Sequence, residues 1–338
     1  MPASVRFLQR FYLLISEQYD MICLIYKLKR IEKMFGNIKR TKQLKSIIRQ
    51  HNKSIKYVKQ INRGYYGYVF LITDPFGKKS VAKVYKKDDY AKREMAQLEM
   101  LAKHSLAHIP EIYAIDTKKQ NGFFDILFME FIDGVDASKI KVIDEKEKMR
   151  LSNEIVDNLI TIHSVSDPNG FGDFVSGNYF ERWQDYYKLQ IDSLFDSLKS
   201  DRPKKFSKQS FSIAEKLYYS FDDVFCLEVK QNSLIHGDYN LWNLMVDPAT
   251  NRLAAVIDPF GCSFADRELD LFQLQNSNGN EYRLLENYAS KIPLSENFEI
   301  KNAYYRFWDD IKHLVNVGYC DNDSFCKYGN MTLELLNR

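Results

Sequence analysis

Residues 234–275 read LIHGDYNLWNLMVDPATNRLAAVIDPFGCSFADRELDLFQLQ, and this stretch decides the fold. Two short apolar runs, 244–246 and 253–257, flank the turn cluster DPATN, a pattern that predicts a β-hairpin. Antiparallel strands return the chain to its starting end. Asn243 before the first strand and Asp258 after the second should therefore lie together, with Asp238 in the loop that precedes them. Three oxygen-bearing side chains at one strand end suit a divalent cation and a general base.

The composition and charge predict a globular protein with two domains or two lobes. The 338 residues are 45% hydrophobic and 28% charged, and the net charge is +3. Residues 26–59 hold twelve Lys or Arg and one acidic residue, so this segment carries +11 and the rest of the chain −8. Because the positive charge is confined to this segment and no aromatic motif is interleaved with it, nucleic-acid binding is not indicated.

The N-terminal segment and the cysteines indicate the compartment. The five cysteines form no CxxC pair, which disfavours a zinc site or a disulfide framework and favours reduced thiols in the cytoplasm. The apolar stretch 11–25 is interrupted by polar residues, so neither a transmembrane segment nor a signal peptide is expected. Residues 1–50 are predicted to form a basic helical extension. We favour an extra helical layer, and contact with a surface or a second copy is the alternative.

A glycine-containing loop lies between two predicted strands, 55–62 and 69–73, and a third strand, 80–85, follows the turn DPFGKK. Gly64 and Gly67 in the sequence RGYYGY would let backbone N–H groups approach nucleotide phosphates. By itself this GxxG spacing is more typical of an ordinary hairpin loop than of a phosphate-binding loop.

Lys83 stands inside the apolar third strand, VAKVY, where an ammonium group is costly unless it meets a partner. Glu94 lies one turn into the predicted helix 89–103 and could be that partner. Kinase-like folds use such a pair to hold a lysine against the α- and β-phosphates. An edge-strand lysine that faces water is the alternative for this segment taken alone.

A hinge is predicted after two further strands, 111–116 and 125–131. Backbone groups around Glu130 and Ile132, just before Asp133-Gly134, could hydrogen-bond an adenine edge. The chain beyond the hinge has helical periodicity. Helices are expected at 145–164, 179–200, 207–225, 266–276, 281–290 and 301–319 and over the last twenty residues, with a glycine-rich loop at 168–177.

These residues resemble the aminoglycoside phosphotransferase and fructosamine kinase family, a branch of the protein-kinase-like fold. The resemblance rests on HGDxxxxN at 236–243, IDP at 257–259 and ADRELDL at 265–271, and it covers about residues 55 to 320. NGFGDFVSG, WxxYY and AYYRFWDDIKHLVNVGY also look like the fructosamine kinase branch. The implied class is α+β: a two-lobed protein-kinase-like fold with a small β-rich N-lobe (51–133) and a larger helical C-lobe (134–338), after the extension 1–50.

The resemblance also implies roles for the residues that match it. Asp238 is the catalytic base, and Asn243 and Asp258 hold Mg²⁺ that bridges the ATP phosphates. Lys83, held by Glu94, contacts the phosphates. Asp270 braces the catalytic loop rather than touching substrate, and ATP and Mg²⁺ are the expected cofactors.

The sequence does not decide which compound accepts the phosphate. The sequence differs from fructosamine kinases at Asn240, where they have tryptophan, and in its shorter glycine loop. A ketosamine is the expected acceptor, and an aminoglycoside or an amino alcohol such as choline is the alternative. Trp183, Trp242 and Trp308, with the acidic pair Asp309-Asp310, could contact a cationic or sugar ligand, although packing in a helical core is the alternative for each tryptophan. A non-catalytic ATP-binding pseudokinase is the hypothesis of another class, and the intact Lys83, Asp238, Asn243 and Asp258 argue against it. A protein kinase is disfavoured because no APE-type activation segment follows.

Overall fold

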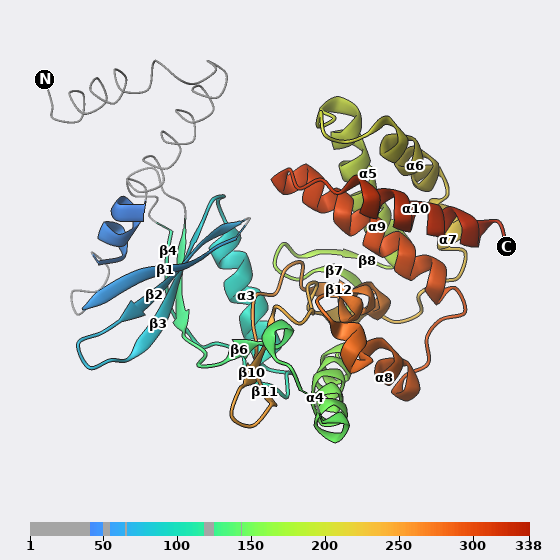
Figure 1. The fold of residues 1–338 in the computed structure, drawn as a ribbon. Coiled ribbons are helices and arrows are strands. Elements are labelled where there is room, and N and C mark those ends of the chain that lie inside the picture. The colour runs from blue at the N-terminus through green and yellow to red at the C-terminus, as the bar shows by residue number, and fades with distance from the viewer. Residues whose placement is uncertain (1–40, 50–54, 65, 118–124, 143) are drawn as a thin grey trace, which may run out of the picture. The chain divides into compact units, whose positions relative to one another are not determined.

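The computed structural model describes residues 41–49, 55–64, 66–117, 125–142 and 144–338 (Figure 1). The described residues fall into two compact units: one contains residues 41–49, 55–62 and 70–82, and the other contains the described residues of 63–69 and 83–338. In the described parts of the chain, no helix is long and apolar enough to cross a membrane. The predicted lobe boundaries at 50/51 and 133/134 stay a prediction.

The first unit contains a short helix and most of three strands. Residues 41–49 are helical and bury Leu44, Ile47 and Ile48, which share one helix face. The Thr41 hydroxyl donates to the Gln60 side-chain carbonyl at 3.2 Å, which ties this helix to a strand of the same unit. The helical prediction is therefore confirmed for 41–49, whereas the other residues of the predicted extension lie outside the described ones.

The N-terminal strands form a five-stranded sheet of order β1-β2-β3-β5-β4. Its strands are β1 (Tyr57–Arg63), β2 (Gly67–Thr73), β3 (Lys79–Tyr85), β4 (Ile112–Asp116) and β5 (Ile126–Glu130). Alternate residues of β2 are buried, as the period of two in a strand requires. The predicted turn between β2 and β3 is confirmed, because the Asp74 carboxylate accepts hydrogen bonds from the backbone N–H groups of Phe76 and Lys78, both at 2.8 Å.

Helix α3 (Tyr90–Ala102) supplies the predicted glutamate. Its buried residues recur at helical spacing and include Glu94, Leu98 and Leu101. In the same unit, β4 and β5 pair antiparallel, with Ile115 opposite Leu127. The prediction of a helix between the third and fourth strands is therefore confirmed.

Two smaller sheets follow the hinge. β6 (Val135–Asp136), β10 (Leu244–Asp247) and β11 (Arg252–Val256) form one of order β11-β10-β6. The predicted hairpin is the antiparallel β10–β11 pair. β7 (Phe171–Asp173), β8 (Asn178–Phe180), β9 (Ser233–Ile235) and β12 (Ser263–Ala265) form the other, of order β8-β7-β12-β9.

Helices make up most of the remaining chain, and their apolar faces share one core. They are α4 (Glu145–His163), α5 (Trp183–Ser200), α6 (Lys208–Tyr219), α7 (Phe221–Val224), α8 (Leu284–Lys291), α9 (Phe298–Val317) and α10 (Asn322–Leu336), with the 3-10 segments η2 (Ala137–Lys139), η3 (Arg267–Gln275) and η4 (Gly279–Tyr282). α9 packs against α10 and α5 (Figure 1). The core between them includes Trp183, Phe195, Tyr305 and Trp308. The α+β class is confirmed.

Three local predictions were wrong. Residues 168–177 are not only a loop, because they contain β7, where Gly172 lets β8 approach so closely that a Cβ atom would lie 2.1 Å from the Asn178 carbonyl oxygen. Residues 207–225 form two helices, which meet at Ser220, rather than one. Residues 267–275 form the 3-10 segment η3 where an ordinary helix was expected. These elements are short, so tertiary contacts decide them more than local periodicity does.

Candidate active site

The hairpin brings Asn243 and Asp258 to one end, as predicted. Asn243 immediately precedes β10, and the backbone N–H of Ile257 donates to the Asn243 carbonyl at 2.9 Å. Asp258 follows directly and has a left-handed backbone with φ of 57°. A non-glycine residue adopts this conformation at some cost, and such residues are frequent at functional sites. At Asp258 the backbone thus leaves the extended conformation of β11.

The loop that carries Asp238 is held from behind by Asp270. The two carboxylate oxygens of Asp270 accept the backbone N–H groups of His236 and Gly237, each at 2.7 Å. Asp270 is fully buried and also lies 3.3 Å from the His163 Nε2 atom. The predicted bracing position of Asp270 is therefore present, and His163 of α4 contacts Asp270 from behind.

Gly237 fits this loop for steric reasons. Its φ is +81°, and a Cβ atom added there would lie 2.2 Å from the Phe260 carbonyl oxygen. Only glycine adopts this conformation freely and leaves room for the backbone of Phe260 and Gly261. The catalytic-loop candidate and the segment after Asp258 are thus packed backbone to backbone.

Asp238 lies in a network of amide donors. The Asn243 side-chain N–H group donates to one carboxylate oxygen at 2.8 Å, and Asn240 donates to the other at 2.6 Å. Burial raises the pKa of Asp238 to about 7, with further increases from the carboxylates of Asp309 and Asp258, whereas Lys312 and the Asn243 hydrogen bond lower it. A carboxylate with a pKa near neutrality is well suited to accept a proton.

Lys83 joins strand, helix and hairpin. Its ammonium group lies 2.7 Å from a Glu94 carboxylate oxygen and 2.5 Å from an Asp258 oxygen. Burial lowers the pKa of Lys83, but the carboxylates of Asp258 and Glu94 raise it by more, so it lies above its ordinary value. The Tyr85 hydroxyl also donates to Glu94 and fixes that carboxylate. The predicted Lys83–Glu94 pair is present, and the edge-strand alternative for Lys83 is wrong.

The glycine loop folds onto the end of β3. The Lys86 ammonium donates to the Gly64 carbonyl at 2.6 Å, and the Lys86 backbone N–H donates to the Tyr66 carbonyl. At Gly67 an added Cβ atom would lie 2.6 Å from the Val84 carbonyl oxygen, whereas Gly64 has open space. Gly67 is therefore required by close backbone packing, and the same argument does not apply to Gly64.

The hinge residues make backbone contacts within the chain. The Glu130 backbone N–H donates to the Glu111 carbonyl at 2.8 Å, and the Ile132 carbonyl accepts from the Gly134 N–H at 3.1 Å. The predicted contact of this segment with an adenine edge stays a prediction. The Glu130 carboxylate is engaged separately, 2.6 Å from His108 Nε2.

A cavity of about 480 Å³ opens beside Gly237 and is lined mainly by acidic and aromatic side chains. Four carboxylates contribute to it, together with Arg93, Lys312 and several rings. The acidic members are Asp88, Asp89, Asp173 and Asp309, and the aromatic ones are Tyr90, Trp183, Tyr186, Phe260 and Phe272. Such a lining suits a ligand that carries hydroxyl and ammonium groups.

The three tryptophans differ in their surroundings. Trp183 and Trp308 are fully buried, and the Trp183 indole N–H donates to the Tyr305 hydroxyl at 2.8 Å. Packing therefore accounts for most of their surface, although Trp183 reaches the wall of the cavity. Trp242 is 58% exposed in the loop that follows Asp238.

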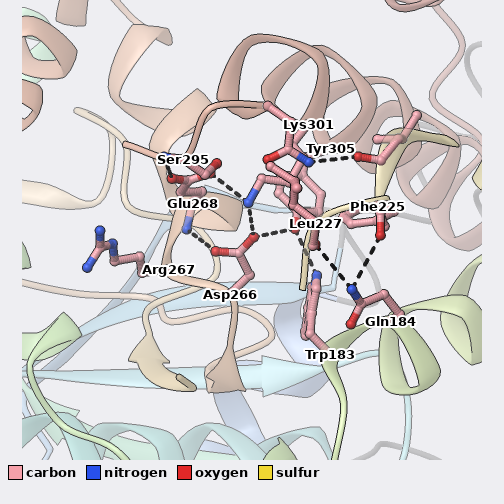
Figure 2. Close-up of polar contacts among 12 residues, drawn as sticks. Trp183, Gln184, Phe225, Leu227, Asp266, Arg267, Glu268, Ser295, Lys301 and Tyr305 are labelled. Carbon is pink, nitrogen blue, oxygen red and sulfur yellow. Dashed lines mark hydrogen bonds and ion pairs between the residues drawn. The ribbon is translucent and has the colours of Figure 1, made fainter. Parts of the chain in front are cut away.

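A buried ionic cluster anchors the segment that carries Asp270 (Figure 2). Lys301 of α9 lies 2.7 Å from oxygens of both Asp266 and Glu268, which stand at the start of η3. Asp266 also accepts from the Tyr305 hydroxyl at 2.8 Å, and Glu268 accepts from the backbone and the hydroxyl group of Ser295. The cluster thus fixes the start of η3 to α9.

The sequence indicated Asp309 as a candidate ligand contact, but it did not indicate Lys312 of α9 or Tyr66 of the glycine loop as neighbours of the site. Asp309 and Lys312 form an ion pair on α9, and the Lys312 ammonium lies 5.4 Å from the centre of the Phe260 ring. Tyr66 stacks on Phe260. The only available signal was the unusual acidic pair at 309–310, because these residues are separated from Asp238 by about 70 or more positions. Asp310 instead accepts from the Ser324 hydroxyl.

Comparison with known proteins gave one family and several relatives. Residues 58–290 match the model of the phosphotransferase enzyme family called APH. Over 233 residues the chain is 26% identical to the uncharacterized protein YcbJ of Escherichia coli K12, an alignment that covers 67% of this chain and 75% of YcbJ.

Two solved structures show the fold. A Thermobifida fusca protein whose name assigns it provisionally to fructosamine-3-kinase has a TM-score of 0.60 at 15% identity, with 83% of this chain and 94% of that one covered. A thermostable mutant of the aminoglycoside phosphotransferase APH(4)-Ia, in a ternary complex with ADP and hygromycin B, has a TM-score of 0.63 at 16% identity, with 86% and 97% covered. The predicted two-lobed kinase-like fold class is therefore confirmed.

Proposed function

This chain belongs to the phosphotransferase enzyme family and transfers phosphate to a hydroxyl group, and from that premise we propose that ATP is its donor and a small ketosamine its acceptor. One observation carries the proposal: Lys83 meets both Glu94 and Asp258, at 2.7 and 2.5 Å, beside the hairpin end that holds Asn243. The use of a nucleotide is supported by the family and by the ADP complex of a structural neighbour.

Asp238 is proposed to accept the proton of the acceptor hydroxyl. Asn240 and Asn243 each hold one of its oxygens, which fixes the direction of the carboxylate. Phosphoryl transfer depends mainly on positioning and on neutralised charge, so a well-oriented base with a raised pKa suits this role. Asp270, through the loop backbone, keeps Asp238 in place and acts as a positioning residue.

Asn243 and Asp258 are proposed to hold Mg²⁺. The side-chain N–H group of Asn243 donates to Asp238, so the side-chain oxygen of Asn243 (Oδ1) is the atom that would bind a cation. The Asp258 carboxylate is half exposed. Among the described residues no three His, Cys, Asp or Glu side chains cluster as a metal site. This donor set fits Mg²⁺, which typically takes one or two protein oxygens plus phosphates and water. The cation would neutralise phosphate charge.

The nucleotide is proposed to lie between the glycine loop and the hinge. Lys83 would contact its phosphates, with Gly64 and Gly67 allowing the loop backbone to approach them. Backbone groups around Glu130 and Ile132 would meet the adenine edge. Glu94 would orient Lys83 rather than touch the nucleotide.

The acceptor is proposed to occupy the acidic cavity beside Gly237. A ketosamine carries several hydroxyl groups and an ammonium group, which match the carboxylates and rings of that lining. The lining would equally suit an aminoglycoside or an amino alcohol, so these are the acceptors to test beside it. We further propose that the enzyme is cytoplasmic. Residues 1–50 are proposed to contact a surface or a second copy of the chain. Deleting residues 1–48 would show whether this segment is needed for activity or only for folding.

Turnover of Mg²⁺-ATP against a panel of ketosamines, aminoglycosides and amino alcohols tests the proposal. We expect phosphate transfer to a ketosamine, and loss of transfer in Asp238→Asn with ATP binding retained. Asp223→Asn, an exposed residue of α7, is the matched control and should behave as wild type. ATP binding without transfer to any compound would indicate a non-catalytic module, and full activity of Asp238→Asn would remove that residue from the mechanism.

A further inference from the structure

Tyr66, in the glycine loop, is held in a stack of aromatic rings. Its ring centre lies 4.4 Å from that of Phe260 and 5.5 Å from that of Tyr90, with interplanar angles of 29° and 19°. Phe260 is the second residue after Asp258, and its carbonyl oxygen packs on Gly237. The stack therefore places a glycine-loop side chain against the backbone that carries both candidate catalytic carboxylates.

The Tyr66 hydroxyl is buried and lacks a partner among the residues that the structure describes. Buried hydroxyl groups in folded proteins almost always form a hydrogen bond, because they otherwise lose their contact with water without compensation. Packing explains the ring of Tyr66 but not its hydroxyl, for which phenylalanine would serve better. An unpartnered group of this kind is completed by a water molecule, an ion or a ligand atom, and its place beside the candidate catalytic residues favours a ligand atom.

The surroundings of this hydroxyl indicate which ligand atom it would meet. Burial raises the pKa of Tyr66, and Tyr90, Asp309 and Asp238 raise it further, so the phenol remains a hydrogen-bond donor. The ring of Tyr66 stacks on Phe260, whose carbonyl oxygen packs against Gly237, the residue before the proposed base. Asp309 is already paired with Lys312. The hydrogen-bond acceptor that this hydroxyl would meet beside Asp238 is the anionic phosphoryl group, which moves past Asp238 during the reaction.

We propose that the Tyr66 hydroxyl donates a hydrogen bond to the phosphoryl group during its transfer, which makes Tyr66 a catalytic residue. The inference rests on the proposed function. In that step the bond between the γ-phosphorus and the bridging oxygen breaks, and its electron pair leaves with ADP. The acceptor oxygen forms the new bond to phosphorus, its proton passes to Asp238, and Tyr66 keeps its own proton throughout.

Tyr66→Phe tests this directly, because it preserves the ring stack and removes only the hydroxyl. A hydrogen bond to a charged group that forms in the transition state corresponds to a kcat lower by about 10- to 100-fold, with the KM for ATP changed less than about twofold. Tyr68→Phe makes the same substitution two positions along, where the ring lies near Arg63 and Lys86, and should leave kcat unchanged.

A second readout does not need an acceptor. Thermal shifts are measured with Mg²⁺-ADP alone and with Mg²⁺-ADP plus orthovanadate, which imitates the phosphoryl group in transfer. We expect wild type and Tyr66→Phe to respond equally to Mg²⁺-ADP, and vanadate to add a clearly larger shift for wild type. Without ligand, Tyr66→Phe should melt at the same temperature as wild type or higher, since it loses an unpartnered buried group.

Each other outcome overturns the inference in a recognisable way. An unchanged kcat with equal vanadate shifts would mean that Tyr66 only packs. A raised KM for ATP with an unchanged kcat would place the hydroxyl on the bound nucleotide rather than on the phosphoryl group in transfer. If wild type fails to bind Mg²⁺-ADP, the proposed function itself fails and this inference falls with it.

Discussion

Lys301→Met should destabilise the protein strongly, because it removes the only cation from the cluster that joins α9 to η3 within the described chain (Figure 2). Lys301, Asp266 and Glu268 are each nearly fully buried. Removing one partner of a buried ion pair typically costs about 3–5 kcal/mol, since a charge stays buried without compensation. Here two carboxylates lose the same partner. We expect a loss of about 3–5 kcal/mol, or a fall in melting temperature of about 10 °C.

Differential scanning fluorimetry and urea unfolding measure this loss, with Lys291→Met as the control. Lys291 makes a comparable 2.7 Å contact with Asp157, but at the surface, where an ion pair contributes about 0–1 kcal/mol. Adding Glu268→Gln to Lys301→Met should restore part of the stability. A melting temperature for Lys301→Met within 2 °C of that for Lys291→Met would refute this reasoning.

Three further predictions concern the catalytic loop. Asn240→Ala should lower kcat about 10-fold without unfolding the protein, because it removes the 2.6 Å hydrogen bond to Asp238, and steady-state kinetics with a circular dichroism control measure this. The kcat/KM should rise with pH through about 7, since the base must be deprotonated, and Asp309→Asn should move that rise to lower pH because it removes a charge that raises the pKa of Asp238. An unmoved rise in Asp309→Asn would contradict this electrostatic account. Gly237→Ala should abolish transfer and lower the melting temperature, because a Cβ atom would lie 2.2 Å from the Phe260 carbonyl oxygen; normal activity would show that the loop relaxes freely.

The predictable part of the site is the part encoded by nearby residues. Two apolar runs and one turn cluster determine the hairpin, so the convergence of Asn243 and Asp258 follows from about 15 residues of sequence. The Lys83–Glu94 pair was also predictable, because an ammonium group in an apolar strand needs a partner and the next helix offers one. In each case a local rule and the global fold favour the same arrangement.

The remainder depends on contacts that no local rule specifies. Strands β7, β8 and β12 have three residues each, too few for a period of two to stand out from a loop. Asn240 was visible as a departure from the fructosamine kinases, but its contact with Asp238 requires a particular side-chain direction. Asp309 and Lys312 approach the site from α9, and their relation to Asp238 follows only from how α9 packs.

The contact between Lys83 and Asp258 has a consequence for how the proposed ligands would bind. In the structure the ammonium group of Lys83 neutralises the Asp258 carboxylate at 2.5 Å. A nucleotide phosphate would compete with Asp258 for Lys83, and a cation would compete with Lys83 for Asp258. Either ligand alone would leave one of the two charges without its present partner, whereas Mg²⁺ and phosphates together supply a new partner to both. The geometry therefore favours joint binding of the metal and the nucleotide, so the apparent affinity for ADP should fall when Mg²⁺ is withheld, and this dependence should weaken in Asp258→Asn.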